Sequence, residues 1–228
     1  MGEVLTSIGV GSYRIDVTAW TLFGLIGNLL FSGRVVAQWW ASERAGRSVV
    51  PVAFWWISLS AVAVHLTYAW GRRDVPFIIG LSITLVPYIR NLSIHYRPHK
   101  PPRPLGPILA AAILLACVPA GIFWRGAPEH NQWFYVGLLG IAVFQSRFFV
   151  AWVYSERLRR ATLPMAFWWL SLVGSLILLI YSLGRADLVF ILSFTFNSIP
   201  YVRNIILLRR ERAGRPATAD RGSPTPRS

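Results

Sequence analysis

The chain has 228 residues, of which 54% are hydrophobic and only 14% are charged, and 11 of them are tryptophan. This composition is typical of a membrane protein rather than a soluble one. The formal net charge of +14 could suggest nucleic-acid binding, but the basic residues lie in short loops and in a tail between apolar segments, where membrane topology places them. We therefore expect no nucleic-acid partner.

The predicted elements begin after a short polar lead at residues 1–17. Seven apolar segments follow, and each has about the 20 residues that a helix needs to cross roughly 30 Å of hydrocarbon. These segments are 18–40, 49–70, 75–95, 105–124, 132–154, 163–184 and 187–208. The proline-rich stretch 97–104 cannot continue a helix and predicts a cytoplasmic linker. Residues 209–228 are rich in Arg, Pro, Ser and Thr and predict a disordered tail.

One stretch of the sequence occurs twice, at a constant offset of 113 residues. FSGRVVAQWWASER at 31–44 is matched by FQSRFFVAWVYSER at 144–157, and PYIRN at 87–91 is matched by PYVRN at 200–204. Because the offset never changes, no insertion or deletion separates the copies. A period this long is too large for a solenoid unit and predicts two copies of one supersecondary module.

The repeat predicts an all-α, polytopic membrane protein with seven transmembrane helices. The two copies are three-helix bundles at 18–95 and 132–208, joined by a linker and a linker helix within 96–131. Three helices per module would leave the second copy inverted, so one additional crossing restores the same orientation to both. We therefore expect two parallel bundles in a 3+1+3 arrangement.

The distribution of basic residues predicts the orientation of these helices. With the N-terminus outside, 14 of the 23 basic residues face the cytoplasm and five face the outside. Without the tail the comparison is eight against five. Because Lys and Arg are enriched in cytoplasmic loops, we expect an N-terminus outside and a C-terminus in the cytoplasm.

The repeated motifs resemble those of the lipid A biosynthesis N-terminal domain family. The pattern is carried by Phe31 to Arg44, Ser48 to Ser58 and Gly71 to Gly80, and the resemblance covers nearly the whole chain in two copies. The family is grouped with PQ-loop and SWEET-like membrane proteins, so the resemblance implies their two-module layout. It is named for its fusion in front of some lipid-A-disaccharide synthases, which implies a role in lipid A metabolism.

Four arginines stand inside the apolar segments: Arg34, Arg90, Arg147 and Arg203. Two lie in the first helix and two in the third helix of a module, so all four fall in the cytoplasmic half of the membrane. Ionised side chains at such depth usually face a cavity or a partner, and four of them would suit an anionic headgroup such as a phosphate. The alternative is snorkelling to the interface, since Arg34 is only about 12 Å from Ser42 at 1.5 Å per residue.

Other polar and aromatic side chains complete the predicted substrate site. Asn91 and Asn204 follow two of the arginines and could hydrogen-bond a ligand or bridge helices. Trp55 and Trp168 could stack on a sugar ring, although anchoring in the interfacial aromatic belt explains them first. The predicted substrate-binding residues are Arg34, Gln38, Arg90, Asn91, Arg147, Arg203, Asn204, Trp55 and Trp168.

Four acids are predicted to support or gate the site. Glu43 and Glu156 follow serines at the cytoplasmic ends of their helices. A local ion pair explains them, and either could instead hold the arginine of a neighbouring helix. Asp74 and Asp187 open the third helices, where an acid in the first turn is explained by helix electrostatics.

Two prolines and one histidine are the other notable residues of the helices. Pro87 and Pro200 lie three residues before an arginine and predict helix kinks, which serve either bending or packing. His65 has Leu178 as its repeat counterpart, and we interpret it as a packing residue rather than a proton relay.

The sequence offers little support for an enzyme. It contains no Ser-His-Asp set, paired catalytic acids or phosphate loop, and Cys117 is its single cysteine. We also expect no glycosyltransferase domain after the second repeat. The second copy also has Ala151 where the first has Gln38, so the two halves should differ at the site. We expect no catalytic residue, metal or cofactor.

The sequence thus favours a bacterial inner-membrane protein that binds and moves a lipid-linked anionic saccharide, such as a polyprenyl-phosphate sugar or a lipid A precursor. Phosphate capture between the modules would be followed by rocking of one module against the other. The alternatives are a non-catalytic membrane partner that docks a glycosyltransferase, a lipid-A-disaccharide-synthase-like activity, and a carrier of a small neutral sugar. Membrane lipids are the other expected partners.

Overall fold

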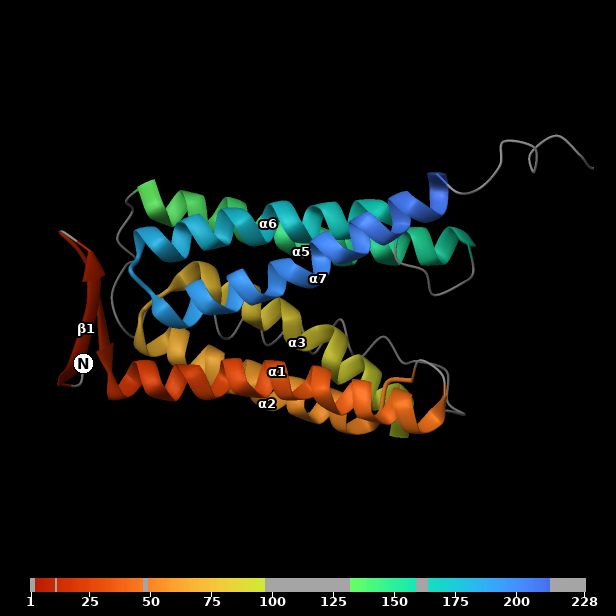
Figure 1. Ribbon diagram of the computed structural model, residues 1–228, viewed down its shortest axis with the longest axis horizontal. Helices are drawn as coiled ribbons and strands as arrows, with labels where there is room; N and C mark the ends of the chain where they lie inside the picture. Colours follow the sequence, from red (N-terminus) through yellow and green to blue (C-terminus); the bar gives the residue numbers. More distant parts are fainter. Residues whose placement is uncertain (1–2, 11, 47–48, 97–131, 159–163, 214–228) are drawn as a thin grey trace, which may run out of the picture.

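The computed structural model describes residues 3–10, 12–46, 49–96, 132–158 and 164–213. In these residues it contains a two-stranded sheet and six helices (Figure 1). The elements are β1 (Val4–Val10), β2 (Tyr13–Thr18), α1 (Ala19–Ala45), α2 (Val52–Gly71), α3 (Val75–Tyr96), α5 (Gln132–Leu158), α6 (Met165–Gly184) and α7 (Leu188–Ala213).

Each helix coincides with one of the predicted apolar segments, and all six are long and apolar enough to cross a membrane. The prediction of a protein built from membrane-length helices is therefore confirmed for the described residues. The seventh predicted helix, at 105–124, and the linker at 97–104 lie outside them, so the 3+1+3 count stays a prediction. α7 continues to Ala213, into the segment predicted as a tail, and the rest of that tail also lies outside the described residues.

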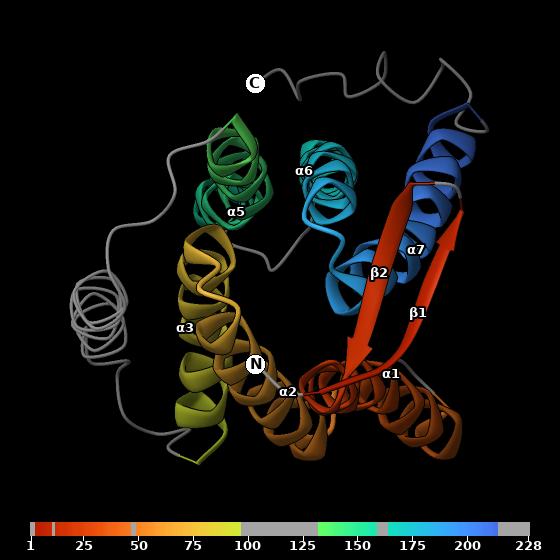
Figure 2. The same ribbon diagram turned by 90° about the vertical axis from the view of Figure 1, so that its left-hand side faces the viewer.

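The polar lead, in which the sequence predicts no regular element, forms a β-hairpin and so departs from a purely helical class. β1 and β2 pair antiparallel, with Ile8 opposite Ile15. Frequent β-branched residues favour this pairing, and Ile15 and Val17 are buried. The Tyr13 hydroxyl donates to the carbonyl oxygen of Leu183 at 2.6 Å. The hairpin is therefore tied to the second repeat at one end of the bundle (Figure 2).

Local signals define where the first helices of the chain begin and end. Thr18 and Thr21 form a capping box, in which each hydroxyl accepts a hydrogen bond of 3.2 Å from the backbone N–H of the other residue. Gly46 ends α1 in the left-handed conformation, with φ of 58°. Pro51 and Pro164 are the N-caps of α2 and α6, at a helix start where the missing N–H of proline is tolerated.

The second and third helices of each repeat are joined by the same tight turn. Arg73 and Ala186, at equivalent positions, adopt φ of 55° and 50°. The N–H groups of Asp74 and Asp187 then donate to carbonyl oxygens five residues earlier, at 2.9 and 3.0 Å, as in a Schellman motif. This turn places an aspartate at the start of each third helix.

The six helices form a closed ring. Within each repeat the second helix packs against the first and the third, and between the repeats α3 packs against α5 and α1 against α7. α1 and α5 both begin at the hairpin end of the bundle (Figure 1), so the two described bundles run parallel. Figure 2 shows the repeats end-on, with α1, α2 and α3 on one side and α5, α6 and α7 on the other.

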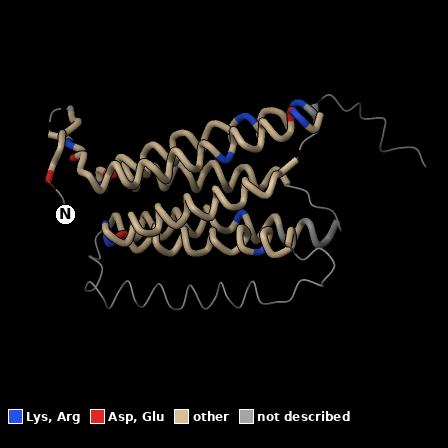
Figure 3. Tube along the Cα trace, turned by 90° about the horizontal axis from the view of Figure 1, so that it is seen from below, with Lys and Arg blue, Asp and Glu red and all other residues tan. Residues whose placement is uncertain are grey.

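The buried core lies where the two repeats meet. Phe77 packs on Phe190, its own repeat equivalent, with ring centroids 3.7 Å apart. Contact between equivalent residues places an approximate twofold axis between the modules. Phe144, Tyr181 and Phe194 belong to the same cluster. The helices are largely free of charged residues, and the basic positions inside them lie in the half of the bundle away from the hairpin (Figure 3).

Candidate functional site

A cavity lies inside the helical ring, between the two repeats, and its empty volume, counted together with the space that opens to solvent, is about 640 Å³. Its lining comes from α1, α2, α3, α5 and α7, and it includes two cations and no carboxylate. The polar lining residues are Arg34, His65, Thr84, Tyr88, Gln145, Arg147, Ser193, Asn197 and Tyr201. A few polar groups in an otherwise apolar wall are typical of ligand pockets.

Arg34 enters the cavity from α1 in the first repeat. Its Nη1 donates to the Tyr88 hydroxyl at 2.6 Å and lies 3.3 Å from the Ser58 hydroxyl. The guanidinium carbon lies 4.6 Å from the centroid of the Phe31 ring, a cation–π contact. Neutral hydroxyl and aromatic groups therefore hold this cation without neutralising it.

Arg147 occupies the equivalent place in α5 of the second repeat. Its Nη1 donates to the Tyr201 hydroxyl at 3.2 Å, and Tyr201 is the repeat counterpart of Tyr88. The guanidinium carbon lies 3.5 Å from the centroid of Phe144 and 4.7 Å from that of Phe148. Only 8% of the residue is exposed. Both repeats thus build the same arrangement of one arginine, one tyrosine and phenylalanine rings.

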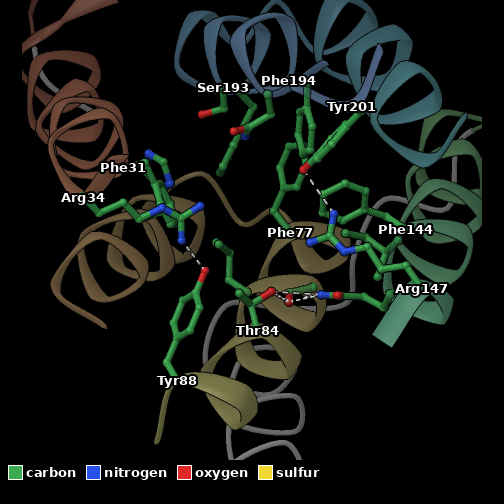
Figure 4. A pocket seen from close by; sticks show the side chains of 17 residues that line it. Phe31, Arg34, Phe77, Thr84, Tyr88, Phe144, Arg147, Ser193, Phe194 and Tyr201 are labelled. Carbon is green, nitrogen blue, oxygen red and sulfur yellow. Dashed lines mark hydrogen bonds between the residues drawn. The ribbon is translucent and has the colours of Figure 1, made fainter. Parts of the chain in front are cut away.

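The two guanidinium groups project from opposite sides of the cavity toward its middle (Figure 4). In each of them, Nε is buried and has no hydrogen-bond partner in the described part of the chain. A buried donor without a partner is unfavourable, more so when it is charged. The pair is therefore suited to donate hydrogen bonds to the oxygens of an anion placed between the repeats.

The structure separates the four predicted arginines into two pairs. Arg90 and Arg203 are exposed and do not line the cavity. Each lies two residues after the tyrosine that does, and two residues turn a helix by about 200°, so the arginine and the tyrosine occupy opposite faces. Arg34 and Arg147 are therefore the arginines that the fold brings together.

The predicted asparagines and tryptophans do not line the cavity. Asn91 and Asn204 donate back to the carbonyl oxygens of the prolines in their own helices, at 2.6 and 2.7 Å. Trp55 packs against Tyr88, with ring centroids 6.1 Å apart, and Trp168 packs against Tyr201 at 6.4 Å. These tryptophans therefore lie behind the tyrosines that hold the arginines.

The remaining predicted residues are dispersed. Gln38 is half-buried in α1 and does not line the cavity. Glu43 is exposed near the end of α1, and the side chain of Glu156 lies outside the described part. Pro87 and Pro200 lie inside α3 and α7, one residue before the cavity tyrosines.

The two predicted aspartates lie away from the cavity, where the hairpin ends of the repeats meet. The Tyr68 hydroxyl of the first repeat donates to Asp187 of the second at 3.1 Å, and the Tyr181 hydroxyl of the second donates to Asp74 of the first at 2.9 Å. Arg72 adds an ion pair to Asp187, with its Nε 3.2 Å from Asp187 Oδ2, whereas Asp74 has no such ion pair among the described residues. The repeats are thus joined by a reciprocal pair of contacts, which we call the aspartate junction.

The carboxylates of the aspartate junction also cap the third helices. Asp74 Oδ1 accepts from the N–H of Phe77 at 3.2 Å, and Asp187 Oδ1 accepts from the N–H of Val189 at 3.1 Å. Burial raises the pKa of Asp74 to about 6 and also raises the pKa of Asp187. The aspartates position helices around the cavity and do not line it.

Tyr88, Tyr201 and Gln145 line the cavity but are not among the site residues predicted from the sequence. Tyr88 and Tyr201 belong to the repeated motifs PYIRN and PYVRN, in which the predicted site residue is the arginine two positions later. The tyrosine and the arginine of each motif differ in the helix face on which they lie. Gln145 donates from Nε2 to the Gly80 carbonyl oxygen and to Thr84 Oγ1, across the interface between α5 and α3. Its repeat counterpart is Ser32, so the repetition gave no signal for it.

The comparison with known proteins agrees with the two-repeat fold. The sequence model described as the Lipid A Biosynthesis N-terminal domain matches residues 23–93 and again residues 136–206. The chain is 29% identical over 221 residues to the lipid-A-disaccharide synthase of Chlamydia muridarum, covering 88% of this chain and 36% of that protein. It is 28% identical over 218 residues to the protein of the same name from Chlamydia trachomatis serovar D, with the same two coverages of 88% and 36%.

A third relative, the lipid-A-disaccharide synthase of Chlamydia abortus, is 29% identical over 205 residues, covering 82% of this chain and 33% of that protein. The chain therefore spans about a third of the length of these curated relatives. No solved structure matches the chain.

Proposed function

Because the chain belongs to the Lipid A Biosynthesis N-terminal domain family, we propose that it binds a lipid-linked anionic saccharide in the cavity between its repeats and moves it across the bacterial inner membrane. A polyprenyl-phosphate sugar or a lipid A precursor is the substrate class. The observation that carries this proposal is the pair formed by Arg34 and Arg147, which line one cavity without a carboxylate among its lining residues.

The charge of this pair argues for an anionic ligand. Removing an ion from water has a penalty of several kcal/mol even after relaxation, and the tyrosine hydroxyls offset only part of it. A phosphate between the two guanidinium groups would supply the opposite charge and accept from both free Nε atoms. A neutral sugar would leave both charges uncompensated, which makes the neutral-sugar carrier the weaker alternative.

The arrangement of the repeats supports movement as well as binding. The cavity lies between two parallel modules related by an approximate twofold axis, and rocking of one module against the other would change which end of the cavity is open. The aspartate junction holds the modules together at the hairpin end. In this proposal the modules separate first at the opposite end, on the side where the two arginines lie.

Binding is tested with a short-chain prenyl phosphate added to the purified protein in detergent. Charged hydrogen bonds contribute roughly 1.5–3 kcal/mol each, so Arg34→Gln and Arg147→Gln should each weaken binding by about tenfold or more. Arg90→Gln and Arg203→Gln are the matched controls, because they remove the same charge from exposed positions in the same fold. Equal losses in all four variants would indicate nonspecific charge attraction and would contradict the proposal.

Transport is tested separately in reconstituted vesicles. A labelled prenyl-phosphate sugar should cross the bilayer faster with the protein than in empty vesicles, and Arg147→Gln should abolish the difference. If the rates in protein-containing and empty vesicles are equal while binding is intact, the protein binds the ligand but does not transport it, and the transport part of the proposal is wrong.

A second candidate is a non-catalytic membrane partner that docks a glycosyltransferase. It is favoured by the relatives, which are named as synthases and which the chain matches over about a third of their length. The exposed Arg209 and Arg210 near the end of α7 would offer a basic contact. Co-purification with a glycosyltransferase that survives Arg147→Gln would favour docking. Product formation by the purified chain from a nucleotide-sugar donor and a lipid acceptor would instead identify a synthase.

A further inference from the structure

We infer that His65 and Gln145 form a hydroxyl-binding subsite beside the arginine pair, so that the cavity selects a phosphorylated saccharide over a phosphate group that carries no sugar. The inference rests on the proposed function, since it concerns the same cavity, and it specifies which part of the ligand each residue contacts.

His65 offers a hydrogen-bond acceptor to this cavity. It lines the cavity, is 2% exposed, and its Nε2 has no partner among the described residues. In the tautomer that carries its proton on Nδ1, the neutral ring presents Nε2 as an acceptor.

Gln145 offers a second acceptor from the other repeat. Its Nε2 is engaged by the Gly80 carbonyl oxygen and by Thr84 Oγ1 at 3.1 Å. These bonds fix the amide so that Oε1 is the free end, and Oε1 is buried without a partner in the described part of the chain. Buried acceptors of this kind are unfavourable until a donor reaches them.

The free groups of the cavity therefore fall into two chemical kinds. Arg34 and Arg147 keep buried donors, whereas His65 and Gln145 keep buried acceptors. A phosphate ester has acceptors for the first kind and, once ionised, no hydrogen to offer the second. The hydroxyl groups of a saccharide supply those donors, so only a ligand with both parts satisfies all four residues.

His65 and Gln145 lie at different depths, because Gln145 is only two residues from Arg147 in α5. The His65 ring packs against Gly27, where a side chain would collide with the imidazole, and Gly27 lies seven residues before Arg34 in α1. At 1.5 Å per residue this distance is about 10 Å toward the hairpin. A hydroxyl that reaches His65 would therefore lie on the hairpin side of the phosphate, and one that reaches Gln145 would lie beside it.

This subsite breaks the symmetry between the repeats. The counterpart of His65 is Leu178, and the counterpart of Gln145 is Ser32, so each acceptor occurs only once, whereas the arginines occur in both repeats. A ligand therefore binds in one rotational orientation, although its charge is held by a symmetric pair.

The test compares two probes, a short-chain prenyl phosphate and the same prenyl phosphate carrying one hexose, by their dissociation constants in detergent. The wild-type protein should bind the hexose-bearing probe on the order of tenfold more tightly, as expected for two added hydrogen bonds. His65→Leu copies the residue of the other repeat and should reduce this ratio severalfold, because it should weaken binding of the hexose-bearing probe more than binding of the bare prenyl phosphate. His65→Gln, which keeps an acceptor, should retain part of the preference.

Each contrary result has a distinct meaning. If the wild-type protein binds both probes equally, this inference is overturned while the proposed function stands. If neither probe binds, the proposed function fails and this inference fails with it. If His65→Leu weakens both probes alike, His65 only packs and the subsite is wrong. Should that variant not fold, Gln145→Met removes the other acceptor and is measured by the same ratio.

Discussion

Single residues decide how closely the helices of each repeat approach. Gly174 of α6 faces α5 so tightly that an added Cβ would lie 2.6 Å from the Cα of Phe144, whereas a Cβ on Gly33 would meet nothing within 4 Å. Backbone atoms cannot rotate away as side chains can, so the two glycines tolerate substitution very differently.

Gly174→Ala should therefore destabilise the protein by about 1–3 kcal/mol, because α5 and α6 must move apart. Gly33→Ala should be neutral or stabilising by up to about 1 kcal/mol, because alanine favours a helix. The apparent melting temperature in one detergent is the measurement. A similar loss in both variants would show that general intolerance of the helices, and not this contact, limits stability.

At the scale of elements, the aspartate junction joins the start of each third helix to the second helix of the other repeat. Asp187 accepts from Tyr68 and pairs with Arg72, whereas Asp74 accepts from Tyr181 and forms no ion pair within 4 Å among the described residues. The repeats therefore use the same residue types with unequal electrostatics.

This inequality predicts unequal substitution effects. Asp74→Asn should cost about 1 kcal/mol or less, because an amide oxygen can still accept from Tyr181 and from the helix N–H. Asp187→Asn should cost more, about 1–3 kcal/mol, because it leaves the partly buried Arg72 without its carboxylate. Unfolding of both variants in the same detergent tests the order, and a larger loss for Asp74→Asn would contradict it.

Stability should also depend on pH through the aspartate junction. Burial raises the folded-state pKa of Asp74 from 3.8 to about 6, against the coulombic effect of Arg185 and the hydrogen bonds from Phe77 and Tyr181. The folded state then holds its proton more tightly than the unfolded state. The stability contribution is full below pH 3.8 and is lost as the pH rises to about 6.

The melting temperature at pH 4.5 should therefore exceed that at pH 7 by an increment that Asp74→Asn reduces. The raised pKa of Asp187 acts in the same direction, so part of the slope should survive in that single variant. A melting temperature that rises between pH 4.5 and pH 7 would contradict the stability contribution that we assign to the raised pKa of Asp74.

At the scale of the whole molecule, the hairpin and the α1–α2 connection lie at opposite ends of the bundle (Figure 1). In a protein without Cys117, a cysteine introduced at Thr6 should react with a membrane-impermeant maleimide added outside the cell. A cysteine at Ala45 should react only after the membrane is opened. The reverse pattern would invert the predicted orientation and place the arginine half of the cavity toward the outside.

The sequence predicted the family and the six described helices because both depend on local information. Twenty-residue apolar segments specify helices of membrane length, and an unchanging offset of 113 residues identifies duplicated bundles. The arginines inside the apolar segments could also be identified from the sequence, because a charged residue stands out in a segment of apolar residues.

The tertiary structure decided which of these residues form a site. Arg34 and Arg90 are equally prominent in the sequence. Of these two, Arg34 lies on a helix face that lines the cavity, and Arg90 does not. His65 and Gln145 carry no repeated signal, and the acceptor of Gln145 is free only because residues of α3 engage its amide nitrogen. Composition and period are properties of the chain, whereas a cavity depends on the relative rotation of helices from both repeats, which no single segment encodes.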